Sequence, residues 1–262
     1  MAVFGFEPVV FTLVLAIIFF GGLVKGIAGF GYAIASTAIL ASVLDPSTAV
    51  VVMILPMLAA NVRLLGELDR TDLPTCVERF WPFVAAALVG TVAGMALLAR
   101  IPKPLLALGL GLFTLTYVLV SQPYAALPGE AWVVDRCFRP GTGAKAILGL
   151  VSGLVFGASN IAVQIVAYLD SLSLDRSTFV GVLAMILVGV SSVRVGAAWY
   201  LGLYESTSLV VVSIVGAAPG LLGVAVGNRL RRYLSPEVET AGALVLLTVI
   251  GLKLSSSGLA AI

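Results

Sequence analysis

The sequence predicts an all-α, polytopic integral membrane protein, with about eight major hydrophobic segments in two related halves and with helices broken at glycines. Of its 262 residues, 60% are hydrophobic and only 11% are charged, whereas a soluble domain carries about a quarter charged residues. The mean hydropathy is +1.14. Because the backbone must satisfy its own hydrogen bonds in lipid, we expect the apolar runs to be helices.

The apolar runs are distributed along the whole chain. They span 8–44, 47–65, 81–99, 104–121, 144–170, 177–203, 207–228 and 236–254. The first has neither a basic region nor a clear cleavage site before it, so we expect a membrane segment rather than a removed signal peptide. Pro56 and Pro219 lie inside apolar runs and are expected to kink their helices.

Two of these runs are interrupted by glycines. The run 8–44 is too long for one crossing at a rise of about 1.5 Å per residue. The interruptions are Gly21-Gly22, Lys25-Gly26 and Gly29-Phe30-Gly31 in this run, and Gly157-Ala158-Ser159-Asn160 in the run 144–170. We expect 22–31 and 157–160 to be non-helical breaks lying near one another inside the protein, since irregular backbone at membrane depth must be buried or line a cavity.

Matching motifs in the same order predict an internal duplication, with a first membrane repeat at 1–121, a connecting loop at 122–143 and a second repeat at 144–262. The matched segments are Gly22-Leu-Val-Lys-Gly26 with Gly149-Leu-Val-Ser-Gly153, Leu44-Asp-Pro-Ser-Thr48 with Leu174-Asp-Arg-Ser-Thr178, Asn61-Val-Arg63 with Ser191-Ser-Val-Arg194, and Gly90, Gly94 and Gly109 with Gly223, Gly227 and Gly242. Duplicated halves are common in secondary transporters, where the substrate site lies at the repeat interface.

Two kinds of residue in these motifs have structural interpretations. Asp45 and Asp175 precede helix-forming segments, so we expect them to cap helices, with Pro46 at a first helical position. The spacings Gly90-x-x-x-Gly94 and Gly223-x-x-x-Gly227 are typical of closely packed membrane helices.

The basic loops leave the orientation of the repeats open. Arg100 and Lys103 lie in one short loop, and a second basic loop contains Arg229, Arg231 and Arg232. Short basic loops favour the cytoplasm, and if both loops are cytoplasmic the repeats are parallel. If each glycine-broken run is a hairpin, an odd number of crossings separates the two loops and the repeats are inverted.

Polar side chains inside the apolar runs are the candidate substrate-binding residues, because they are costly in lipid. Arg194 lies deep within the run 177–203, preceded by Ser191 and Ser192, and Asn160 lies in the second glycine-rich interruption. The guanidinium of Arg194 suits a pair of anion oxygens, and the amide and hydroxyl groups could orient such an anion. The alternatives are a snorkelling arginine and hydrogen bonding between helices.

Further candidates lie in the first half. Lys25 stands beside Gly29 and Gly31, where exposed backbone N–H groups and a cation could bind an anion together. Its alternative is a lysine that marks a helix end. Asn61 and Arg63 lie at the end of their run, where snorkelling competes with substrate binding for the arginine.

The residues that are missing exclude several activities. The chain contains no histidine, which removes the general base that the superficially protease-like motif Gly157-Ala158-Ser159-Asn160 would need. It contains no phosphate-binding loop for ATP. We therefore expect no enzyme, no cofactor, no metal and no nucleic-acid partner. An anion channel or a non-transporting membrane subunit stays an alternative to a carrier.

The segments GGLVKGIAGFGYAIASTAIL and GLVSGLVFGASNIAVQIVAY, with the repeated LDPST and LDRST turns, resemble the TauE/SafE family of sulfite exporters and toluenesulfonate-uptake permeases. The resemblance covers nearly the whole chain. It implies a secondary transporter, in the cytoplasmic membrane, for small sulfur-containing anions such as sulfite or organosulfonates of the sulfoacetate type. Its partners would be the anionic substrate and the lipid bilayer, with a homodimer left open. Lys25 and Ala158-Ser159-Asn160 depart from the common glycine motifs.

Overall fold

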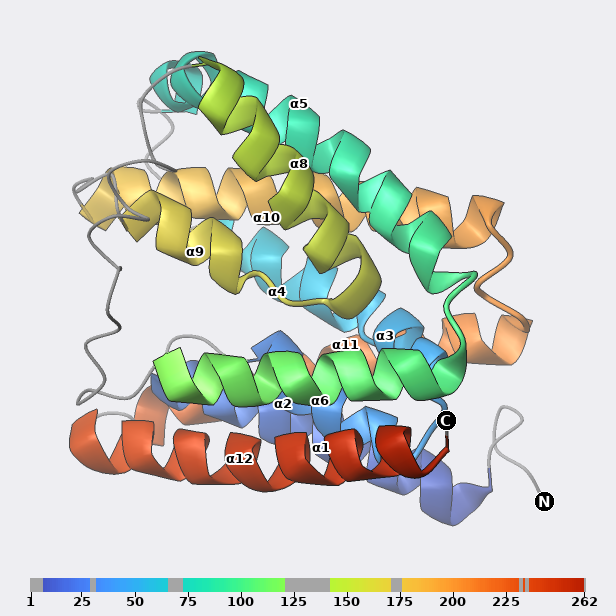
Figure 1. Cartoon of the computed structure of the whole chain (residues 1–262). Coiled ribbons are helices and arrows are strands. Elements are labelled where there is room, and N and C mark those ends of the chain that lie inside the picture. The colour runs from blue at the N-terminus through green and yellow to red at the C-terminus, as the bar shows by residue number, and fades with distance from the viewer. Residues whose placement is uncertain are drawn as a thin grey trace. The chain divides into compact units, whose positions relative to one another are not determined.

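A computed structural model describes residues 7–28, 32–65, 73–120, 142–170, 176–230, 233 and 236–261 (Figure 1). Every regular element in these ranges is helical. The helices are α1 (Pro8–Ala28), α2 (Tyr32–Ala41), α3 (Pro46–Val52), α4 (Ile54–Leu65), α5 (Leu73–Leu98), α6 (Lys103–Val120), α8 (Thr142–Ser159), α9 (Val163–Asp170), α10 (Arg176–Tyr200), α11 (Thr207–Leu230) and α12 (Pro236–Ala260). The candidates Gly29 and Gly31, the cap Asp175 and nearly all of the loop 122–143 lie outside the described residues.

Helices that can cross a membrane confirm the predicted class. Among the described residues, those long and apolar enough are Pro8–Ile27, Pro46–Arg63, Phe80–Leu98, Val182–Tyr200 and Thr207–Leu230. Shorter apolar helices cover Lys103–Thr116, Gly143–Ser159 and Leu247–Ala260. The protein is therefore an all-α, multi-pass membrane protein, and the number of eight segments stays a prediction.

The chain forms two compact units that do not follow the order of the sequence. Unit 1 contains Met1–Ala60, Ala99–Ala125 and Gly202–Ile262. Unit 2 contains Asn61–Leu98 and Ala126–Leu201. Each unit therefore draws on chain segments from both sides of the expected connecting loop, and the duplication itself stays a prediction.

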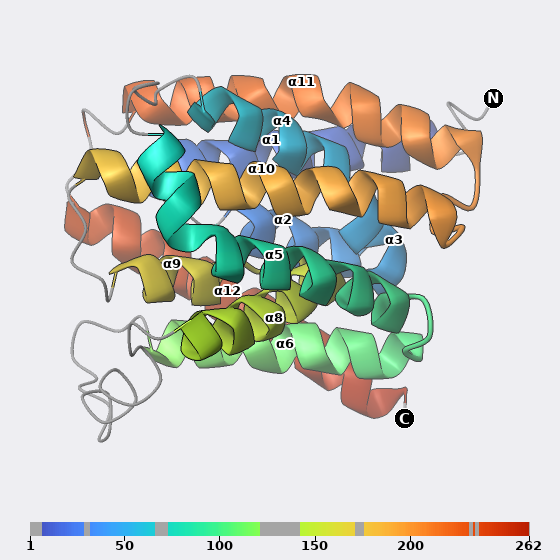
Figure 2. The ribbon, with the colours of Figure 1, turned by 90° about the horizontal axis from the view of Figure 1, so that it is seen from above.

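A pair of helices without side chains between them forms the centre of unit 1. Gly22 and Gly26 of α1 lie against the backbone of α11 at Gly220 and Val224. In return, Gly223 and Gly227 of α11 lie against the backbone of α1. The contacts advance in the same direction along both helices, so α1 and α11 run parallel (Figure 2).

Unit 2 contains a helix pair of the same kind. Gly90 and Gly94 of α5 lie against the backbone of α8 at Leu150 and Leu154, and Gly153 of α8 lies against the backbone of α5. These contacts also advance in the same direction, so α5 and α8 run parallel. The close contacts expected from the four-residue glycine spacings are thus confirmed in both units.

The direction of α6 and α12, both in unit 1, bears on the orientation of the repeats. Gly111 of α6 faces Ser255 of α12, whereas Leu108, earlier in α6, faces Gly258, later in α12. The two helices are therefore antiparallel, as Figure 1 shows. The equivalence of α6 and α12 as parts of two repeats stays a prediction, and if it holds, their antiparallel directions fit inverted rather than parallel repeats.

The backbone around Pro56 shows how a proline is accommodated at membrane depth. A proline has no N–H to donate to the carbonyl four residues earlier, and here that carbonyl belongs to Val52. The helix is interrupted at Met53, and the Val52 carbonyl accepts a hydrogen bond of 2.7 Å from Oγ of Ser213 on α11. Pro56 thus lies in the first turn of α4, just after the interruption at Met53, while Pro219 is contained within the continuous α11.

Asp45 occupies the predicted position but makes a different bond. It is the N-cap residue of α3 and Pro46 is at the first helical position, as expected, yet its side chain makes no capping hydrogen bond. The carboxylate instead pairs with the ammonium of Lys103 at 2.9 Å. The expectation of a side-chain cap was therefore wrong for Asp45, because a cation within reach competes with the backbone N–H groups.

The expected breaks differ from the observed ones. The α1 helix continues through Gly21-Gly22 and Lys25-Gly26 to Ala28, so a break over that stretch was wrong. Their missing side chains serve close packing instead, since Gly22 and Gly26 lie against α11 and Gly21 lies against Ser36 of α2. In the second half, α8 ends at Ser159 and α9 begins at Val163, so the break falls at 160–162. The two regions belong to different units, and their proximity stays a prediction.

Candidate functional site

Arg194 is the largest fully buried side chain among the described residues, with 0% of its surface exposed. It lies in α10, inside a segment long enough to cross the membrane. Its Nε donates a hydrogen bond to Sδ of Met95 on α5 at 3.5 Å. Its guanidinium carbon lies 5.0 Å from the centre of the Phe156 ring on α8. Three helices of unit 2 therefore enclose the cation.

The contacts of Arg194 with Met95 and with Phe156 are both with neutral groups that interact weakly with a cation. A thioether is a weak hydrogen-bond acceptor, and an aromatic face contributes only about 0.5–2 kcal/mol to a nearby cation. Phe156 lies in the last turn of α8, where the helix dipole also favours positive charge. These contacts place the guanidinium against side chains of α5 and α8.

A polar pair lies one turn before the arginine. Nδ2 of Asn61, on α4, donates a hydrogen bond of 3.2 Å to Oγ of Ser191 on α10. Ser191 and Arg194 are three residues apart and share one face of α10. Asn61 and Ser191 are both buried, so unit 2 combines a cation, a hydroxyl and an amide in its interior.

Asn160 ends α8 in a conformation that few side chains adopt. Its φ of 66° is left-handed, and its N–H bonds to the carbonyl of Phe156 at 2.9 Å. Asparagine is the residue other than glycine that most readily takes this conformation at a helix end. The side chain is fully buried. Its backbone therefore has a clear structural role, and a role for its amide in substrate binding stays a prediction.

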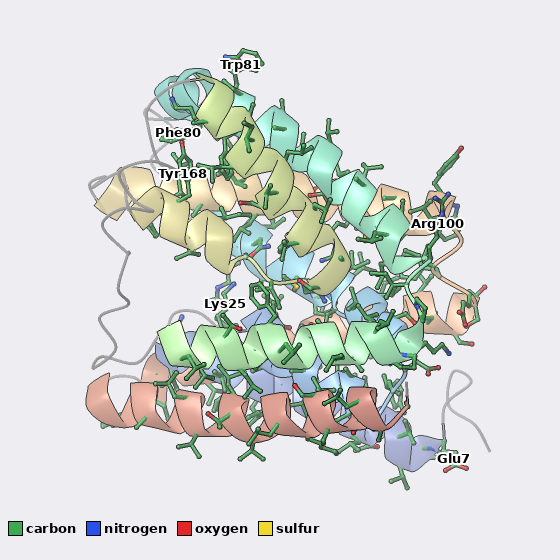
Figure 3. All side chains as sticks on the ribbon, viewed as in Figure 1. Glu7, Lys25, Phe80, Trp81, Arg100 and Tyr168 are labelled. Carbon is green, nitrogen blue, oxygen red and sulfur yellow. The ribbon has the colours of Figure 1, made fainter. Side chains whose placement is uncertain are left out.

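The remaining candidates have different surroundings. Ser192 points away from this interior and is exposed, and so is Arg63 near the end of α4. Lys25 is partly buried in unit 1, on the last turn of α1, with its Nζ 5.8 Å from the centre of the Tyr32 ring (Figure 3). The structure therefore brings together Asn61 and Ser191, beside Arg194, within unit 2.

Met95 and Phe156 were not among the expected site residues. Met95 is separated from Arg194 by 99 positions in the sequence, and both residues resemble ordinary core side chains. The glycine pattern contained a weak signal, since Met95 directly follows Gly94 on the face that packs against α8. A second aromatic contact, between Phe83 of α5 and Tyr168 of α9, stacks the rings 4.7 Å apart in the same unit.

Among the residues that the structure describes, no group of three or more histidine, cysteine or acidic side chains could hold a metal ion. The buried polar groups of unit 2 include the cation Arg194, the hydroxyl of Ser191 and the amides of Asn61 and Asn160. This set recognises negative charge and donates hydrogen bonds.

The helices and their apolar lengths define a multi-pass α-helical membrane protein. A family model described as sulfite exporter TauE/SafE matches residues 14–254 of the chain. The protein belongs to the sulfite exporter TauE/SafE family, and it is therefore a membrane transporter. Comparisons with curated proteins and with solved structures gave no match.

Proposed function

We propose that the protein is a secondary carrier that exports small sulfur-containing oxyanions, such as sulfite or organosulfonates, across the cytoplasmic membrane. The observation that carries this proposal is the complete burial of Arg194 in a membrane-spanning helix. An arginine at the bilayer centre costs about 2.5–3.5 kcal/mol on insertion scales. That cost is expected to be offset by a function, and family membership indicates that the function is transport.

The chemistry of the substrate follows from the guanidinium. Its planar fork presents parallel N–H donors that match two oxygens of one anion. The oxygens of a sulfite or sulfonate group offer such a pair. The hydroxyl of Ser191, oriented by Asn61, would supply a further donor and replace part of the hydration shell that the anion loses. Asn160 is the remaining candidate from the end of α8.

The helix directions support transport by alternating access. If 1–121 and 144–262 are repeats, α6 and α12 are equivalent helices, and they run antiparallel. Inverted repeats exchange conformations between their two halves, which opens a central site alternately to each side of the membrane. A broken helix such as α8–α9 is a common component of these sites.

The proposal is tested by sulfite flux into proteoliposomes that contain the purified protein. A carrier shows uptake that saturates with sulfite concentration and is accelerated by unlabelled sulfite on the opposite side. Sulfoacetate and taurine, as competitors, would identify the preferred class. Flux that rises linearly with concentration, without counter-exchange, would identify a channel instead, and the absence of flux would favour a non-transporting subunit.

A further inference from the structure

Two buried hydroxyl groups in unit 1 have no hydrogen-bond partner among the residues that the structure describes. They belong to Tyr32, which is 4% exposed, and Ser36, which is 0% exposed. A buried hydroxyl without a partner costs about 1–3 kcal/mol. Natural structures rarely retain such groups without a reason, so a partner that is absent here is expected in the working protein.

The two hydroxyls share one face of α2 and point at the same helix pair. Tyr32 and Ser36 are four residues apart, so they lie one above the other on the helix. The Tyr32 hydroxyl lies against Gly220 of α11, where a Cβ atom would collide with it. The Ser36 hydroxyl lies in the same way against Gly21 of α1. Because both positions are glycine, each hydroxyl fits into the space that a Cβ atom would occupy.

A positive charge lies near the ring of Tyr32. Nζ of Lys25 is 5.8 Å from the centre of the Tyr32 ring, and Figure 3 shows this lysine in unit 1. A cation next to two O–H donors discourages a bound metal cation and favours an oxyanion, whose oxygens accept hydrogen bonds. Unit 2 offers the same combination, with Arg194 as the cation and Ser191 and Asn61 as neutral donors.

We propose that Lys25, Tyr32 and Ser36 form a second oxyanion subsite, in which the two hydroxyls donate hydrogen bonds to a sulfite or sulfonate group. This inference rests on the proposed transport function. It adds two residues that determine specificity, in the unit that does not contain Arg194. An anion with at least two oxygens on one centre satisfies both hydroxyls, whereas a halide offers no separate acceptor for each.

Removing the hydroxyls distinguishes a structural role from a binding role, because the two roles predict opposite changes in melting temperature. Tyr32→Phe and Ser36→Ala keep the apolar volume and delete only the groups without a partner. We expect both variants to melt at a higher temperature than the wild type in detergent, because an uncompensated polar group has been removed. We also expect the sulfite concentration for half-maximal flux to rise about tenfold or more, since a hydrogen bond to a charged ligand is lost.

Ser255 provides a matched control in the same unit. Its hydroxyl is also buried and also lacks a partner among the described residues, but it faces Gly111 in the α6–α12 contact. Ser255→Ala should raise the melting temperature and leave the half-maximal sulfite concentration unchanged. The control thus separates the stability effect, common to the three hydroxyls, from the binding effect.

The possible outcomes separate this inference from the proposed function. Normal half-maximal concentrations in Tyr32→Phe and Ser36→Ala would overturn the subsite while leaving the transporter intact. Lower melting temperatures in both variants would also overturn it, since they would reveal structural partners. If the wild-type protein neither transports sulfite nor is stabilised by sulfite in the melting experiment, the proposed function and the subsite both fail.

Discussion

The contact between α5 and α8 allows a sharp test of the packing in unit 2. At Gly153, an added Cβ would lie closer than 3.0 Å to the backbone of Ala87, including its carbonyl oxygen. Because backbone atoms cannot move aside like a flexible side chain, the two helices would have to separate. Overpacking of this kind costs about 1–3 kcal/mol. We therefore expect Gly153→Ala to destabilise the protein.

Replacing glycine by alanine also stabilises a helix, and this gain can be measured separately at a glycine with open space around it. Gly196 of α10 belongs to the same unit, and a Cβ there would meet nothing within 4 Å. Alanine is better than glycine inside a helix by about 1 kcal/mol, so Gly196→Ala should stabilise the protein slightly. The same helix gain of about 1 kcal/mol applies at Gly153, so the net loss of stability in that variant should be about 0–2 kcal/mol.

Thermal melting of the purified variants in detergent, followed by circular dichroism, distinguishes these results. The expected pattern is a lower melting temperature for Gly153→Ala and an equal or higher one for Gly196→Ala. If the melting temperatures of both variants shift in the same direction by the same amount, the close approach of α5 and α8 plays no part in stability and the packing argument is refuted.

Three further predictions concern unit 1. Cysteines introduced at Lys103 and Ala260 should be labelled by an impermeant thiol reagent from one side of the membrane, and a cysteine at Arg229 from the other side. This is expected because α6 and α12 are antiparallel. Labelling of all three cysteines from one side would contradict that direction. Ser213→Ala should cost about 1 kcal/mol, measured by melting, because the carbonyl of Val52 loses its partner beside the proline. Lys103→Met should leave the melting temperature nearly unchanged, since exposed ion pairs contribute little, and a large loss would assign this pair a role beyond the surface.

The sequence predicts the class of the fold because the bilayer imposes a simple length and composition rule. Runs such as 207–228 are too apolar and too long for a soluble surface, and the structure has a helix there that is long and apolar enough to cross a membrane. The burial of Arg194 was predictable for the same reason, because a charge in the middle of such a run must be enclosed.

The position of the first break was not predictable from composition, because glycine has two uses. At Gly22 and Gly26 the missing side chain permits contact with α11, and the helix continues. At the end of α8 it is Asn160, not a glycine, that takes the left-handed conformation. Only the position of the neighbouring helix distinguishes a packing glycine from a helix break.

The partners of Arg194 were unpredictable for a related reason. Met95 and Phe156 are apolar residues of other helices, and their significance comes from the parallel contact of α5 with α8. The bond between Asn61 and Ser191 joins two motifs that the sequence comparison had aligned as equivalent. The alignment of the two motifs predicted similar roles for them. It could not predict that they touch, because a contact depends on the three-dimensional arrangement.

The central claim is that Arg194 binds the transported anion, and saturable sulfite flux in proteoliposomes tests it most directly. Arg194→Ala should abolish saturable flux while the purified protein stays folded and monodisperse. Arg194→Lys keeps the charge but loses the paired donors, so it should transport with a higher half-maximal concentration. If Arg194→Ala transports sulfite like the wild type while Lys25→Ala does not, the anion is bound in the other unit and the account of Arg194 is wrong.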